Sequence, residues 1–137
     1  MSLRGSARHS ILGIRHIDML HELIPTRQVP GEPRRRWFTS PNCDLIVWMD
    51  GAAPSGFQLC YDKDAQEHAL TWRPGLGFSH MRVSDGRRGS HKGTPLLEPD
   101  GRCDPAHILE VFNKEAAFLP REYVALVEEK VRELGLL

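Results

Sequence analysis

Polar side chains that could hold an anion recur through the middle of the chain. Gln58 lies in one alternating stretch, Thr71 and Arg73 lie in the next, and His80 and Arg82 lie in a third. An amide, a hydroxyl, two guanidiniums and an imidazole suit a carboxylate or a phosphate when rigid strands fix them. We expect these residues to bind an anionic small molecule or a protein partner if strand register gathers them on one uncovered sheet face. The alternative is the ordinary polar surface of an antiparallel sheet.

A glycine-rich segment at 84–94 is the second candidate for binding. Its glycines free backbone N–H groups to face an anion, and Arg87, Arg88 and Lys92 add positive charge. The segment does not match G-x-x-x-x-G-K-[ST], and Pro95 follows it without the start of a helix. We predict that it supports anion binding rather than forming a nucleotide site. The alternative is a loop that is simply exposed to solvent.

Acid–base or nucleophilic catalysis is a competing hypothesis. His80 is the candidate general base, with Asp85 or Cys60 assisting it, and this arrangement predicts a pocket with His80 at its floor. A cysteine on a strand is more often a small buried apolar residue, and no Gly-x-Ser-x-Gly motif occurs. We therefore expect a non-enzymatic binding or accessory module, with a small enzyme as the first alternative and a structural homo-oligomer, such as a homodimer, as the second.

Recognised metal-binding patterns do not occur in the sequence. Neither His-x-x-x-His nor His-Glu-x-x-His is present, and we predict no metal site and no cofactor. Four histidines receive no role, because they fall in the N-terminal segment or on a helix surface: His9, His16, His21 and His107. The residues whose side chains could ligate a metal have no recognised metal-ligand spacing: Asp62, Asp64, His68, His80, Asp85 and His91.

Composition restricts the class of partner. The 137 residues include 18 basic and 18 acidic side chains, so the formal net charge is zero. Three arginines at 34–36 precede Trp37 and Phe38, a combination found in single-strand binders, but a neutral domain argues against nucleic acid. No apolar run approaches the roughly 20 residues of a membrane helix. Three cysteines without a C-x-x-C pair indicate reduced thiols and a cytoplasmic protein.

The elements that must position these residues predict an α+β fold. Alternating or apolar stretches at 37–38, 44–50, 57–61, 68–73 and 78–83 favour strands, and Leu96 and Leu97 suggest a short edge strand. Short loops join them, and such loops favour antiparallel neighbours because a parallel connection needs about a dozen residues or more. We predict an antiparallel β-meander of four to six strands. The run at 44–50 predicts a central strand buried on both faces.

Two amphipathic helices should follow the meander. Asp104 is a good N-cap, Pro105 suits the first helical position, Pro120 separates the two helices and Gly135 ends the second. We predict that both helices pack on one face of the sheet, because neither can bury its apolar stripe alone.

The domain boundary is predicted near residue 34. Residues 35–137 should form a single α+β domain, and residues 1–34 a partly mobile N-terminal extension. Within that extension, Ile14, Ile17 and Ile24 recur at helical spacing, which predicts a short helix over 14–24.

Overall fold

A single antiparallel sheet forms the frame of the protein. The computed structural model describes residues 15–84, 96–99 and 103–136. In these residues seven strands lie side by side in chain order, and every neighbouring pair is antiparallel. The predicted antiparallel meander is confirmed, and the strand at 96–97 is present, but the sheet has seven strands instead of four to six because β1 adds to its edge. The strands are β1 (His21–Glu22), β2 (Arg35–Thr39), β3 (Cys43–Asp50), β4 (Ala53–Tyr61), β5 (His68–Arg73), β6 (Gly77–Ser84) and β7 (Leu96–Pro99).

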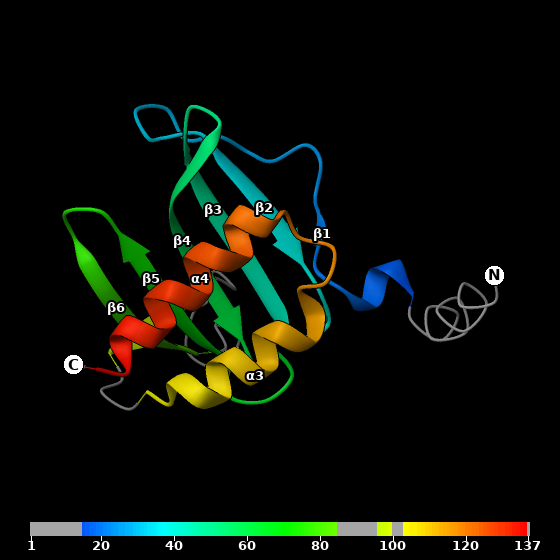
Figure 1. Cartoon of the computed structure of the whole chain (residues 1–137), viewed down its shortest axis with the longest axis vertical. Helices are drawn as coiled ribbons and strands as arrows, with labels where there is room; N and C mark the ends of the chain where they lie inside the picture. The colour runs from blue at the N-terminus through cyan, green and yellow to red at the C-terminus, as the bar shows by residue number, and fades with distance from the viewer. Residues whose placement is uncertain (1–14, 85–95, 100–102, 137) are drawn as a thin grey trace.

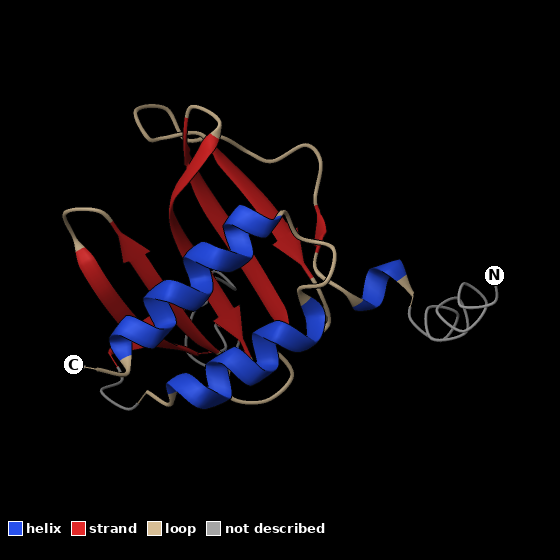
Figure 2. Ribbon diagram, in the orientation of Figure 1, coloured by secondary structure: helices blue, strands red, loops and turns tan. Residues whose placement is uncertain are grey.

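Two helices cover one face of this sheet, as predicted (Figure 1). Helix α3 spans Pro105–Glu115 and helix α4 spans Arg121–Leu134. Both ribbons lie in front of the strands in Figure 2, and no α-helix of the described residues lies over the other face. The predicted N-cap is confirmed, because the Asp104 side chain accepts a hydrogen bond from the backbone N–H of His107. Neither helix is long and apolar enough to cross a membrane.

The core lies between the sheet and the helices. Alternate residues of each central strand point toward the helices, and the strand pairing aligns them in rows. Burial of these apolar side chains is the main favourable contribution to stability, at about 25 cal/mol per Å² of apolar surface. The residues that are at most 1% exposed include Leu45, Val47, Phe57, Leu59, Leu70, Ile108, Phe112, Val127 and Val131.

The β3–β4 hairpin is tighter than the sequence suggests. The alternating stretch predicts a strand only from residue 57, but β4 begins at Ala53. Gly51 makes this possible, because its backbone adopts φ +64°, in the left-handed region that glycine occupies without steric cost. On β3, the expected burial on both faces holds only in part. Trp48 is buried on the uncovered face, whereas Ile46 on the same face is half-buried.

The N-terminal segment differs from the prediction. Over the described part of 14–24, residues His16–Asp18 form one turn of 3-10 helix, and β1 pairs with β2. The predicted helix is therefore wrong. Leu20 is 1% exposed, and its backbone N–H donates to the carbonyl of Glu115 at 2.7 Å. Pairing with the sheet edge and with the end of α3 satisfies this backbone, so tertiary contacts outweigh the weak helical spacing.

Candidate functional site

The predicted anion-binding residues do not share one face of the sheet. Gln58 pairs with Thr71, and the Thr71 hydroxyl donates to the Gln58 amide oxygen at 3.2 Å on the uncovered face. His80 pairs instead with Leu70, whose side chain lies in the core. Because side chains alternate along a strand, His80 points to the helix-covered face. The expectation of a single cluster is therefore wrong.

The two predicted arginines are also separated. Arg73 lies on the uncovered face, where its guanidinium stacks 4.2 Å above the ring of Trp48. Arg82 pairs with His68 across β5 and β6, and both belong to the helix-covered side. The separation follows from the strand register. Arg73 pairs with Gly77, and Arg82 lies five positions further along β6. An odd offset along a strand places two side chains on opposite faces. The predicted residues Arg87, Arg88, Lys92 and Asp85 lie outside the described residues.

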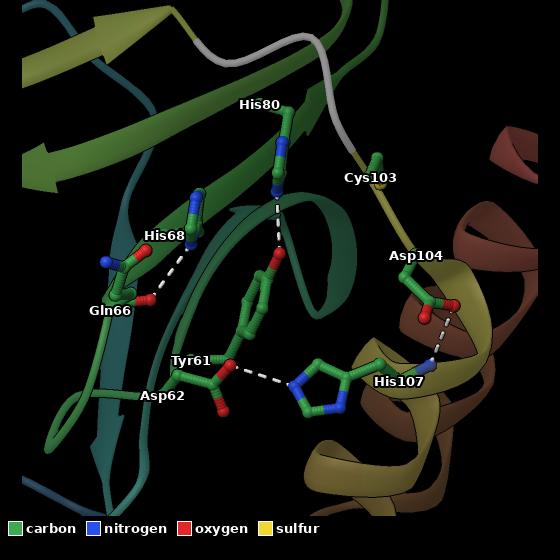
Figure 3. A pocket seen from close by; sticks show the side chains of 8 residues that line it. All are labelled: Tyr61, Asp62, Gln66, His68, His80, Cys103, Asp104 and His107. Atoms are coloured by element: carbon green, nitrogen blue, oxygen red, sulfur yellow. Dashed lines mark hydrogen bonds and ion pairs between the residues drawn. The ribbon is translucent and has the colours of Figure 1, made fainter.

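A pocket of about 370 Å³ opens where three strands meet the start of α3. We call it the histidine pocket, and Figure 3 shows the side chains that surround it. Its volume falls in the range of about 300–1,000 Å³ that is typical of small-molecule sites. Its residues come from the end of β4 and the turn after it, from β5 and β6, and from the start of α3. They are Tyr61, Asp62, Gln66, His68, His80, Cys103, Asp104 and His107.

Tyr61 and His80 form a close polar pair in this pocket. The Tyr61 hydroxyl lies 2.6 Å from Nε2 of His80, and either group donates the hydrogen bond according to the tautomer of the imidazole. The His80 ring also stacks on that of His68, with centroids 5.1 Å apart and planes inclined by 3°. Tyr61 is only 4% exposed, so the strands hold this pair in a fixed position. Such a pair can accept or deliver a proton.

Asp62 and His107 form a second pair (Figure 3). Nε2 of His107 donates to Oδ2 of Asp62 at 2.8 Å, because a carboxylate can only accept. This contact fixes the tautomer of the neutral imidazole, which leaves Nδ1 as its acceptor. The backbone places both residues: Asp62 turns the chain with φ +57°, and His107 lies in the first turn of α3, next to the Asp104 cap.

Tyr61, Asp62 and His107 were not identified from the sequence as site residues. Asp62 lies in a turn, where aspartate is common for local reasons alone, and His107 lies on a helix without any metal-ligand spacing. The pairing of the β4 end with the start of α3 joins residues 45 positions apart. The one usable signal was the aromatic residue that ends an alternating strand directly before a charged turn.

Cys60 cannot assist His80, contrary to the catalytic hypothesis. It pairs with Ala69 and lies on the uncovered face, whereas its neighbour Tyr61 faces the pocket. Burial, followed by the nearby Glu67 and Asp44 carboxylates, raises the pKa of the Cys60 thiol to about 12. The thiol is therefore protonated at neutral pH and is a poor nucleophile.

The histidine pocket does not present a ready metal site. Across the residues that the structure describes, no three His, Cys, Asp or Glu side chains are grouped so that they could hold a metal ion. Comparisons of the chain with protein-family models, with curated proteins and with solved structures found no match. Any inference about function therefore depends on the residues of the histidine pocket and not on similarity to a known protein.

Proposed function

We propose that the protein binds a small anionic molecule in the histidine pocket. The observation that carries the proposal is the presence of three imidazoles, those of His68, His80 and His107, around one cavity of about 370 Å³. Imidazole is the side chain that gains positive charge between pH 8 and 5, and each ring nitrogen that carries a proton is a donor. The groups lie on strands and at a helix start, which hold them in place.

The two carboxylates of the pocket do not prevent anion binding. Asp62 accepts a hydrogen bond from His107 at 2.8 Å, and Asp104 accepts one from the backbone N–H of His107 at 3.3 Å. Both negative charges are therefore partly neutralised by donors. Arg82 is the cross-strand neighbour of His68 on the same face, so it adds positive charge beside the site.

Carboxylate ligands provide the test. A panel of mono-, di- and tricarboxylates is titrated into the full chain by isothermal titration calorimetry. We expect at least one member of the panel to bind, and its affinity to fall by about tenfold or more in His80→Gln. His16→Gln is the matched control, because His16 stacks on Phe118 and does not line the pocket. Binding that is unchanged in His80→Gln would refute the proposal.

Substitutions of Arg82 and Arg73 test which face of the sheet binds the ligand. Arg82→Gln should weaken carboxylate binding severalfold, because it removes charge on the pocket side, whereas Arg73→Gln should leave it unchanged. The opposite result would indicate that the ligand binds on the uncovered face, beside Gln58 and Thr71.

Acid–base catalysis is a second candidate, favoured by the 2.6 Å contact between Tyr61 and His80. In this proposal His80 removes a proton from a bound substrate, with Tyr61 as its partner in place of Asp85 or Cys60. A positioned acid or base typically contributes about 10²–10⁴ to a rate. Any turnover found on a panel of carboxylic esters and amides should therefore fall by about 100-fold or more in His80→Gln. Turnover that survives this substitution, or no turnover at all, counts against it.

We also propose a cytoplasmic location. The support is that Cys43, Cys60 and Cys103 form no disulfide among the described residues. Reduced thiols of this kind are typical of cytoplasmic proteins. Labelling of thiols in intact cells, followed by fractionation, would test it, and recovery of an oxidised, secreted chain would contradict it.

A further inference from the structure

A second pocket lies at the β1–β2 edge of the sheet, where these two strands meet the loop between them. It has a volume of about 280 Å³ and shares no lining residue with the histidine pocket. Three arginines and one glutamate line it, so its charge is positive. We call it the arginine pocket. Its residues are Glu22, Ile24, Pro25, Thr26, Gln28, Arg34, Arg35 and Arg36.

The glutamate of this pocket is already fully engaged. Arg36 donates from Nε to one oxygen of Glu22 at 2.8 Å and from Nη2 to the other at 2.6 Å. The remaining Nη1 of Arg36 donates to the Tyr123 hydroxyl at 2.6 Å, which links the pocket to α4. This fork-to-fork contact holds Arg36. Hydrogen bonding to Arg36, with a smaller contribution from the charge of Arg34, lowers the pKa of Glu22, but one carboxylate beside three guanidiniums leaves the pocket with a net positive charge.

Arg34 and Arg35 retain guanidinium groups without an acidic partner. Nε of Arg35 donates to the carbonyl of Arg27 at 2.9 Å, but its Nη atoms contact no carboxylate among the described residues. Arg34 is exposed, and the described chain offers its side chain neither a hydrogen bond nor an ion pair. Two forks of N–H donors therefore remain beside one cavity, the arrangement that recognises phosphate oxygens.

The backbone of the pocket is fixed independently of any ligand. The Gln28 side chain donates from Nε2 to the carbonyl of Arg35 and accepts from its N–H, both at 2.9 Å. This clamp holds the loop against β2, much as a neighbouring strand would. On the loop side, Ile24 is 79% exposed and gives the pocket an apolar wall next to Pro25. A ligand with an apolar part could pack there.

We propose that the arginine pocket binds the phosphate group of a small organic molecule. Arg34 and Arg35 hold the phosphate oxygens, Arg36 and Gln28 fix the floor, and Ile24 contacts the carbon part of the ligand. The proposal is independent of carboxylate binding in the histidine pocket. The volume suits a small phosphate monoester, since about 300 Å³ is the lower end of small-molecule sites.

Phenyl phosphate, inorganic phosphate and a single-stranded oligonucleotide serve as probes in calorimetric titrations of the full chain in low-salt, phosphate-free buffer. We expect phenyl phosphate to bind more tightly than inorganic phosphate. Arg34→Gln should weaken phenyl phosphate binding by about tenfold or more. Its folding should be intact, because the Arg34 side chain is exposed and the substitution keeps the backbone carbonyl that accepts from Met49. Arg121→Gln is the matched control, since Arg121 is an exposed arginine at the start of α4. This variant should bind as the wild type does.

Five outcomes would overturn the proposal in whole or in part. Equal binding by the wild type and Arg34→Gln, or no binding at about 10 mM phenyl phosphate, would refute it. Loss of phenyl phosphate binding in His80→Gln would show that the phosphate binds in the histidine pocket instead. Much tighter binding of the oligonucleotide, with a steep salt dependence, would assign the surface to nucleic acid. Equal affinity for both phosphates would refute the role of Ile24.

Discussion

One buried carboxylate joins the end of α3 to the turn between β2 and β3. Glu115 is 8% exposed, and it accepts hydrogen bonds from the Ser40 hydroxyl at 2.6 Å and the Asn42 amide at 2.7 Å. The backbone N–H of Asn42 donates to it as well, at 3.2 Å. A buried charge is tolerated when donors surround it in this way.

Removing this carboxylate should destabilise the protein. In Glu115→Ala, the two Asn42 donors lose their acceptor and the Ser40 hydroxyl keeps only its longer contact with the carbonyl of Cys43 at 3.2 Å, so we expect the free energy of unfolding to fall by about 2–4 kcal/mol. Urea unfolding followed by circular dichroism measures the change. Glu110→Ala on the exposed side of the same helix is the control, and it should change stability by less than about 0.5 kcal/mol. Equal midpoints for the two variants would contradict this account.

The face of a helix or strand on which a residue lies was easier to predict than the residues that it contacts. The helical spacing that includes Ile108, Phe112 and Glu115 correctly puts Glu115 on the buried side of α3, but it cannot name the turn that supplies its donors. Likewise, alternation along β6 puts His80 and Arg82 on one face, but only the pairing with β5 decides which face this is. The partner of each residue depends on contacts that are distant in sequence.

Among the elements, the strands and helices with strong local signals were predicted well. Asp104 and Pro105 mark the start of α3, and Gly135 follows the end of α4, because capping residues act locally. The predicted helix over 14–24 is wrong because its spacing is weak and Leu20 is drawn into the core next to the sheet edge. The start of β4 at Ala53 was missed because Pro54 and Gly56 are typical of loops.

Gly56 provides a test of how closely β4 and β5 approach. A Cβ atom at this position would lie 2.9 Å from the carbonyl oxygen of Trp72 and 3.4 Å from Cα of Arg73. Because both atoms belong to backbone, Gly56→Ala must push the strands apart, and we expect a loss of about 1–3 kcal/mol in urea unfolding. Gly75→Asn is the control, since Gly75 has φ +81° and open space around it, and asparagine tolerates this conformation. A stability loss no greater than that of the control would show that the strands adjust freely.

At the scale of the whole molecule, carboxylates lie in different surroundings, so that some of them stabilise the fold when ionised and others destabilise it. Glu22 bridges β1 to Arg36 on β2, and hydrogen bonding to Arg36 lowers the pKa of Glu22. Glu67 precedes β5, and burial, followed by the charge of Asp44, raises its pKa. The net charge of zero conceals this difference, because it counts both groups equally.

The two carboxylates should therefore affect acid stability with opposite signs. The folded-state pKa of Glu67 is raised, so its ionised form opposes folding at neutral pH, and this cost disappears as the pH falls through that pKa to the unfolded value near 4.3. Glu67→Gln should raise the free energy of unfolding at pH 7, with the gain shrinking toward pH 4. Glu22, whose pKa is lowered, stabilises the fold above its unfolded pKa, so Glu22→Gln should lower stability at pH 7 and lose this effect in acid. Urea titrations of both variants from pH 3 to pH 7 measure the differences from wild type, and two differences of the same sign at pH 7 would contradict the assignment.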